Sequence, residues 1–205
     1  MEGQVIVIGG VRIDEIRDPR GLREVPAGRG LDVARVLASA GIDVTVLAGI
    51  AEDQDGAWIR SAAEDAGVRL VALNAPEGTP RRRVVDDGRT PPVIDWCGTV
   101  LGSGGAAAPA EGDEASIARV VAGAVARAVA GARVVVFADS RGRGIAIDPD
   151  APVTVELCEG EPPMVYGTQI SEDDRVLLDR ILTALEQPGA SSESRLRRSL
   201  DRVAT

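Results

Sequence analysis

The sequence predicts an α/β protein with a mostly parallel sheet flanked by helices. Residues 5–8 form a short, continuously apolar run, and 133–138 is apolar after its first residue; both are rich in β-branched residues, as buried strands are. A third such run, 44–49, follows a stretch at 26–41 that has the 3.6-residue periodicity of a helix. Because strands that alternate with helices favour parallel pairing through right-handed crossovers, we expect residues 1–73 to form a β-α-β-α-β unit.

The first helix follows a glycine-rich turn. Pro26 to Gly41 reads PAGRGLDVARVLASAG, in which Gly28 and Gly30 precede the apolar stripe and Gly41 supplies a C-terminal stop. Glycines at this turn would let the backbone approach a small ligand, and the first N–H groups of the helix would favour a polar or anionic group. The alternative is that the glycines only permit a tight connection between a strand and a helix.

The second helix and the third strand complete this unit. Acidic residues at 52–55 follow the strand at 44–49, and 68–73 is a further apolar run. Between them, helical spacing predicts one apolar stripe: Trp58, Ile59, Ala62 and Ala63.

A small β element is predicted beside this unit. Residues 81–85 and 93–96, joined through a turn at 86–88, have the pattern of a hairpin with one polar face, and the prolines before 93 favour an edge position. Residues 17–26 are polar and indicate an irregular or edge segment. We expect segments 11–26 and 79–97 to form a lid; a surface excursion without a role is the alternative.

The second half of the chain continues the alternation. We expect a flexible loop at 98–112, a helix at 114–130, strands at 153–157 and 165–170, and a helix at 172–187. The inward positions of that last helix are predicted to be Val176, Leu177, Ile181, Leu182 and Leu185. Residues 1–187 are therefore expected to form one domain, and 188–205 a tail that forms a short helix or frays.

Composition excludes several kinds of chemistry. The chain has no His, and all 23 basic residues are Arg, which rules out Ser-His-Asp triads, His-ligated metals, lysine Schiff bases and a P-loop lysine. A net charge of −9 argues against nucleic-acid binding. Cys97 and Cys158 indicate neither a disulfide framework nor a zinc site. No apolar run approaches the ~20 residues that span a bilayer, and no signal peptide is apparent, so we expect a cytoplasmic protein that does not bind membranes.

Asp14 is the first candidate binding residue. It lies just past the C-terminal end of the strand at 5–8, and ligands of open α/β sheets bind at this edge. Its carboxylate would accept hydrogen bonds from hydroxyl groups. A solvated loop aspartate is the alternative.

Several motifs in the same order resemble those of the ribokinase-like (PfkB) carbohydrate kinases. Residues 26–34, PAGRGLDVA, are similar to the family pattern P-G-G-K-G-x-N-x-A, and 50–56 to V-G-D-D-x-x-G. The nearest branch resembled is the heptose-7-phosphate kinases, whose T-x-K-x-R-V-I and V-D elements fall on 79–85 and 94–95. Their S-D-Y-x-R-G lines up with 138–139 and 143–144, with one extra residue between.

This resemblance implies a three-layer, Rossmann-like fold with a small β lid, and a sugar or sugar phosphate as substrate, with ATP and Mg²⁺ as cofactors if kinase activity is retained. Carried over to this chain, the substrate-binding residues are Asp14, Gly28, Arg29, Gly30, Asp32, Arg81, Arg83, Asp95 and Asp139.

The chain also departs from the family pattern. Arg29 and Asp32 stand where the family has Lys and Asn, and residues 173–176 lack the glutamate of the family's N-x-x-E. The family's G-A-G-D element, which carries an anion hole and the catalytic base, does not occur in the sequence. The alignment of this chain with the family ends where that part of the fold would begin. A positioned base contributes about 10²- to 10⁴-fold in rate and one oxyanion donor about 10²- to 10³-fold.

We therefore expect a degenerate, C-terminally truncated homologue, a pseudokinase with no catalytic residue or metal site that acts by binding a sugar or a partner. One alternative is a sugar kinase whose site is completed by another chain, in a homo- or hetero-oligomer formed through the lid or the truncated sheet edge. Another is an interaction module without a ligand, using an apolar stripe in the tail: Leu196, Leu200 and Val203.

Overall fold

The computed structural model describes residues 5–19, 21–75, 77–85, 93–97, 125, 129, 131–138, 153–157, 162–166 and 170–186. The expected loop at 98–112, most of the helix expected at 114–130, and the tail at 188–205 lie outside these residues. None of the described helices has the length and apolar character needed to cross a lipid bilayer.

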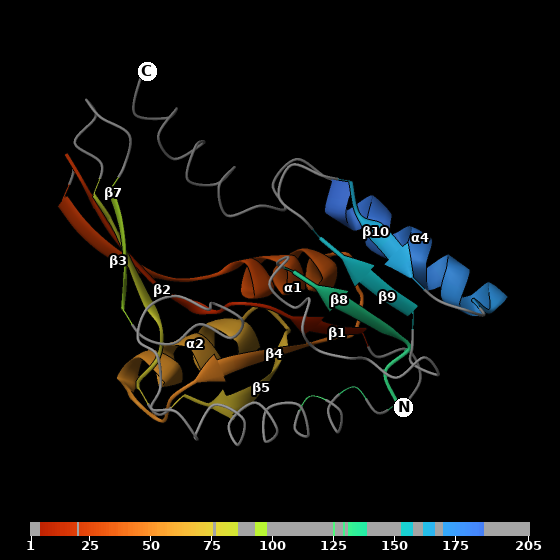
Figure 1. Ribbon diagram of the computed structural model, residues 1–205, viewed down its shortest axis with the longest axis horizontal. Helices are drawn as coiled ribbons and strands as arrows, with labels where there is room; N and C mark the ends of the chain where they lie inside the picture. Colours follow the sequence, from red (N-terminus) through yellow and green to blue (C-terminus); the bar gives the residue numbers. More distant parts are fainter. Residues whose placement is uncertain are drawn as a thin grey trace, which may run out of the picture.

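The centre of the fold is a six-stranded sheet with the strand order β10-β9-β8-β1-β4-β5 (Figure 1). β9 and β10 pair antiparallel, and the other neighbouring strands pair parallel, which confirms the predicted mostly parallel sheet. The strands are β1 (Val5–Ile8), β4 (Val44–Ile50), β5 (Arg69–Asn74), β8 (Val134–Phe137), β9 (Val153–Glu156) and β10 (Met164–Tyr166).

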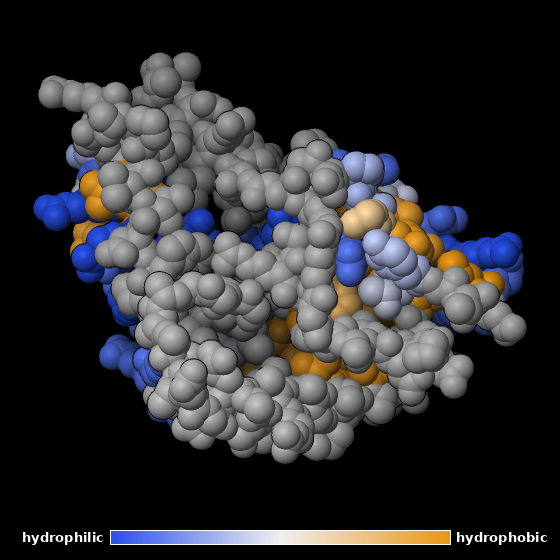
Figure 2. All heavy atoms as spheres, in the orientation of Figure 1, coloured by the Kyte–Doolittle hydropathy of each residue, from blue (hydrophilic) through white to orange (hydrophobic). Residues whose placement is uncertain are grey.

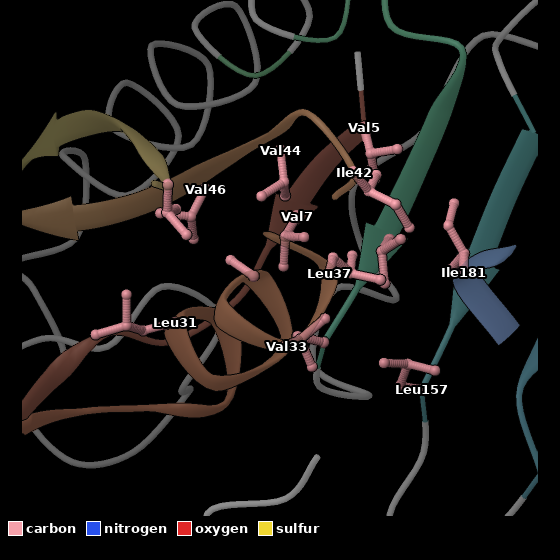
Figure 3. Packing of buried hydrophobic residues seen from close by; sticks show 14 of the residues in the cluster. Val5, Val7, Leu31, Val33, Leu37, Ile42, Val44, Val46, Leu157 and Ile181 are labelled. Carbon is pink, nitrogen blue, oxygen red and sulfur yellow. The ribbon is translucent and has the colours of Figure 1, made fainter. Parts of the chain in front are cut away.

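Three helices pack on one face of this sheet: α1 (Arg29–Ser39), α2 (Gln54–Glu64) and α4 (Glu172–Glu186). Their buried side chains join alternate residues of the strands in one apolar cluster; Figure 3 shows Leu37 of α1 and Ile181 of α4 with Val5 and Val7 of β1. The opposite face carries a second cluster, which includes Ile6, Phe137 and Val125. β1 is thus buried on both faces, as its continuous apolar run predicts.

The helix ends follow local sequence signals. Gly41 has a φ of 72°, and the N–H of Ile42 bonds to Leu37 O, so α1 ends in a Schellman motif with Gly41 at C′ as predicted. At the start of α2 the side chain of Asp53 accepts a hydrogen bond from the N–H of Gly56. Two inward positions were predicted wrongly: Trp58 and Val176 are exposed, and Leu178 and Ala184 are buried in α4 instead of Val176.

A second, four-stranded sheet, which we call the small sheet, has the order β3-β2-β6-β7. Its strands are β2 (Arg12–Asp18), β3 (Gly21–Ala27), β6 (Arg81–Val85) and β7 (Val93–Cys97). The predicted hairpin is the antiparallel pair β6–β7. Residues 17–26 were expected to be either irregular or an edge segment, and β3 is an edge strand. The other strand, β2, was not predicted; it pairs antiparallel with β3 and parallel with β6.

Candidate functional site

The topology of the large sheet marks one crevice. From β1 the chain passes through α1 to β4 on one side, whereas from β8 it continues to β9 on the other side. In open α/β sheets, ligands bind where connections leave neighbouring strands in opposite directions, outside their carboxyl ends. The crevice at the carboxyl ends of β1 and β8 is therefore the candidate site, and we call it the switch-point crevice.

Glycines bring two segments, 9–10 after β1 and 28–30 at the start of α1, together at this crevice. A Cβ atom on Gly28 would lie 2.3 Å from Gly10 O, and one on Gly30 would lie 2.7 Å from Gly9 O. The N–H of Gly30 donates to Gly10 O at 3.0 Å, which holds the first turn of α1 against the segment that follows β1. Backbone packing alone is therefore a sufficient reason for both glycines, and it also places the N-terminus of α1 at the crevice.

Asp14 lies in β2 beside this turn and is covered, with 1% of the residue exposed. Its Oδ1 accepts hydrogen bonds from Arg12 Nε at 2.7 Å and from Arg82 Nε at 2.9 Å. Its Oδ2 accepts a further hydrogen bond from Arg82 Nη2. The interpretation of Asp14 as a solvated loop residue is therefore wrong. A ligand hydroxyl that bonds to this carboxylate has to share it with two guanidinium groups.

Burial dominates the electrostatics of this cluster. Arg12 is 7% exposed, and desolvation lowers its pKa, an effect that the neighbouring Asp14 opposes and Arg82 reinforces. Asp32, in the first turn of α1, is also buried and lies close enough to raise the pKa of Arg12. Its Oδ1 is 3.9 Å from Arg35 Nη1. Arg29 is the first residue of α1 and is half-buried. The structure thus gathers five of the predicted binding residues around the N-terminus of α1: Asp14, Gly28, Arg29, Gly30 and Asp32.

Arg81 and Arg83 form a separate group. Successive residues of a strand point to opposite faces, so both lie on the other face of β6 from Arg82. Arg81 makes a bidentate contact with Asp55 at 2.5 and 2.7 Å, and its Nη1 donates to Glu24 at 2.6 Å. These hydrogen bonds, chiefly the one to Asp55, raise the pKa of Arg81.

Arg83 Nε donates to Glu15 Oε1 at 2.8 Å. Asp95 is the register partner of Arg83 on β7, and Asp139 lies outside the described residues. Through Arg81 and Arg83 the small sheet is held to α2 and within itself, and neither guanidinium group contacts Asp14.

Two residues of the site were not predicted, namely Arg12 and Arg82. Arg82 is the middle residue of the run Arg81-Arg82-Arg83, and the period-2 alternation of a strand would have separated it from its neighbours. The pairing of β6 with β2, which sets Arg82 opposite Asp14, is a contact over 68 residues. Its register is set by the tertiary structure.

The residues echoing the family's V-G-D-D-x-x-G form a structural junction. Asp53 accepts hydrogen bonds from the N–H and the hydroxyl of Thr79, at 2.8 and 2.6 Å, as well as from Gly56. Desolvation acts to raise the pKa of Asp53, but the bonds from Thr79 and Gly56 outweigh it, so the pKa lies below its ordinary value. This junction ties the start of α2 to the segment that leads into β6.

The segment that departs from the family's N-x-x-E also has a local role. Asp174 is bonded to Ser171 Oγ at 2.5 Å and to Arg133 Nε at 2.7 Å, and these bonds, that from Ser171 first, lower its pKa despite partial burial. Within the described ranges, no three acidic or cysteine side chains converge where they could hold a metal ion.

Comparison with known proteins adds to this geometry. No family profile and no curated protein matches the sequence. Among solved structures, the PfkB protein from Polaromonas sp. JS666 is 15% identical with a TM-score of 0.50, over 98% of this chain and 99% of that one. Fructokinase from Vibrio cholerae O395 is 14% identical with a TM-score of 0.48, over 95% and 93% of the two chains.

A probable sugar kinase from Rhizobium etli CFN 42 is 16% identical with a TM-score of 0.45, over 67% of this chain. The match spans 46% of the length of that protein, and also 46% of another solved protein, Sa239. Similarity at such low identity shows the fold alone. This chain has a ribokinase-like α/β fold and covers part of it.

Proposed function

We propose that this chain is a homologue of the PfkB-type carbohydrate kinases that binds a sugar or sugar phosphate in the switch-point crevice and does not transfer phosphate by itself. The fold supports the homology, and the gathering of Asp14, Gly28, Gly30 and Asp32 at the crevice supports a binding site there. The heptose-7-phosphate kinases are the branch that we propose as nearest, on the sequence motifs at 79–85, 94–95 and 138–144. A cytoplasmic location belongs to the same proposal.

The proposal that the chain binds a ligand without transferring phosphate depends on the hydrogen bonding of Asp14. Both carboxylate oxygens accept hydrogen bonds from Arg12 or Arg82 in a covered position. Kinases work almost entirely by positioning the acceptor and stabilising the moving phosphoryl charge. The family's catalytic base lies in its G-A-G-D element, which does not occur in this sequence, and Asp14, held by two guanidinium groups, is not arranged to take over that role.

The test is a binding screen combined with a kinase assay. A ligand present at 100 times its dissociation constant stabilises the folded state by about 2.7 kcal/mol, which is a rise of roughly 5–10 °C in melting temperature for a chain of this size. We expect such a rise with a sugar or a sugar phosphate, and no product from ATP. Arg29→Gln should reduce the rise, and Arg69→Gln, on the distant strand β5, should not. Phosphorylation of a panel sugar at about 1 to 100 s⁻¹, the range typical of kinases, would contradict the proposal.

A second candidate is a kinase that is active only when a partner chain completes it, and the face of the small sheet away from Asp14 offers a surface on which such a partner would assemble. A groove of about 460 Å³ runs over that sheet between Leu22, which is 63% exposed, and Val85. Apolar and charged residues lie side by side on this part of the surface (Figure 2). We propose that a second copy of this chain, or a different protein, covers this groove. A protein that sediments as a monomer at 50 μM or about that concentration, alone and with ATP and sugar, would exclude self-association.

A further inference from the structure

Strand β5 is an edge of the large sheet that lacks the usual protection of edge strands. Prolines, charged side chains, bulges and short strands keep the edges of natural sheets from pairing with another chain. β3 contains Pro26 and two charged residues, β7 follows the prolines at 91–92, and β10 has three residues and follows the prolines at 162–163. β5 has six residues, no proline and one charged residue, which stands at its first position. Among the edges that the structure describes, β5 is therefore the one most open to pairing.

β5 is also regular and partly exposed. Its six residues pair with residues 45–50 of β4 without a bulge. Within the described residues no strand pairs with its other side, which forms the lower border of the large sheet in Figure 1. Val71 is 42% exposed, although it shares a face of the sheet with the buried Leu47 of β4. The outward backbone groups of β5 thus lie beside an exposed apolar side chain.

This edge is electrically neutral, unlike the chain as a whole. Arg69 donates to both carboxylate oxygens of Asp43 at 2.7 Å, and the other residues of β5 are uncharged. The net charge of −9 makes two copies repel each other at long range, but physiological salt screens exposed charges beyond about 8 Å. Two copies can therefore meet at β5 without placing like charges against each other.

The edge is complementary to a second copy of itself. An antiparallel pair of identical strands has a two-fold axis, and with that axis perpendicular to the sheet each face continues into the other copy. The residue on the axis then lies opposite its own counterpart. With Val71 on the axis, Leu70 lies opposite Ala72 of the partner subunit, and Arg69 lies opposite Leu73 of the partner subunit. The three central residues of β5 thus all have apolar cross-strand neighbours.

We propose that β5 is a homodimer interface, at which two copies pair antiparallel about Val71 and join their large sheets into one. The occupant is a second copy because this edge supplies both halves of the match in length, charge and apolar pattern. Backbone hydrogen bonds give such strand addition its affinity. Pairing over a strand of this length buries less than the roughly 1,200 Å² of standard interfaces, so we expect a dissociation constant of about 1–100 μM. The interface is separate from the groove on the small sheet and does not depend on the proposed function.

The experiment is sedimentation velocity of the whole chain from about 1 to about 300 μM, which should follow the change from monomer to dimer. Val71→Lys sets two like charges opposite each other, because this position pairs with itself, and should weaken the dimer by about 5- to 30-fold. Val71→Glu should weaken it by a similar factor. An equimolar mixture of the two variants should associate about tenfold more tightly than either variant alone, because opposite charges then face each other.

Two control variants carry the same change at other exposed apolar positions. Leu22, at the groove on the small sheet, is 63% exposed, and Val176, on α4, is 56% exposed. Leu22→Lys and Val176→Lys should keep the dissociation constant of the wild-type dimer. Because Val71 is also exposed, the Val71 variants should keep the wild-type circular dichroism spectrum, which separates loss of pairing from loss of folding.

Hydrogen exchange of the wild-type protein gives a measurement that is independent of the variants. The amides of residues 69–74 should exchange more slowly at about 300 μM than at about 5 μM, and those of residues 164–166 should not change. Equal exchange of residues 69–74 at the two concentrations, or a wild-type chain that stays monomeric throughout, would overturn the proposal.

The remaining outcomes distinguish this interface from the groove on the small sheet. A mixture of the two Val71 variants that associates no more tightly than each alone would overturn the antiparallel pairing about Val71. Loss of the dimer in Leu22→Lys, with both Val71 variants unchanged, would place self-association at the groove, which overturns the β5 interface and supports the second candidate function. The results of the sugar-binding screen bear on the proposed function alone.

Discussion

Asp14→Asn is expected to destabilise the folded chain strongly, because it removes a carboxylate charge to which two covered guanidinium groups are hydrogen-bonded. Arg12 is 7% exposed, and the side chains of Asp14 and Arg82 are 2% and 11% exposed. Removing one member of a buried ion pair costs about 3–5 kcal/mol, because the buried charge that stays behind loses that partner. For a chain of about this length, each kcal/mol lowers the melting temperature by roughly 2–4 °C, so the variant should melt about 6–20 °C below wild type.

Urea unfolding followed by circular dichroism measures this difference, and an exposed ion pair supplies the control. Asp43 binds Arg69 through both oxygens at 2.7 Å, but the two side chains are 59% and 51% exposed. Exposed pairs of this kind contribute about 0–1 kcal/mol, so Asp43→Asn should unfold close to wild type. If Asp14→Asn also stays within about 1 kcal/mol of wild type, the cluster is not desolvated and the reasoning fails.

Three further outcomes are expected. Gly28→Ala should destabilise the chain by several kcal/mol, roughly the sum of overpacking and backbone strain, since φ is 120° and the new Cβ would lie 2.3 Å from a backbone oxygen. Gly41→Ala, which has a positive φ but open space around the new Cβ, should show only the backbone strain in the same urea titration. The pKa of Asp53 lies below its ordinary value of 3.8, so its contribution to stability is present above about pH 4 and is lost as the pH falls through the folded-state pKa. Below about pH 4, the melting temperature of Asp53→Asn should therefore fall less steeply with pH than that of wild type, and parallel plots of melting temperature against pH would contradict this. Ile181→Ala, at a fully buried position, should cost about 2–5 kcal/mol, and Val176→Ala, on the exposed side of the same helix, less than about 0.5 kcal/mol; equal effects would place the wrong face of α4 on the core.

Much of the large sheet could be predicted because its strands are buried on both faces. The apolar runs that became β1, β4 and β8 contain no polar residue except Thr45 in β4, which is also buried. The helix periodicity gave α1 and its C′ glycine correctly. Strand β2 reads RIDEIRD and carries five charged residues in seven, a pattern that resembles a solvated loop. It is a strand because β3 and β6 pair with it on both sides and supply counter-charges.

The candidate site was predictable in position and not in content. Asp14 could be singled out because it follows a buried strand at the edge where ligands bind in open α/β sheets. Its partner Arg82 could not, because nothing local relates the two across 68 residues. Likewise, Arg81 and Arg83 fit the motif in sequence, but strand alternation places them on the opposite face, against Asp55, Glu24 and Glu15.

The sequence by itself determined most strands and helices of the large sheet, the absence of histidine and lysine chemistry, and the glycines that permit close backbone contact, because these depend on residue type and spacing along the chain. Only the tertiary structure decided which arginines reach Asp14. Register between strands from distant segments is set by burial and by charge pairing across the sheet, and a shift of one residue would have brought a different arginine to the same carboxylate.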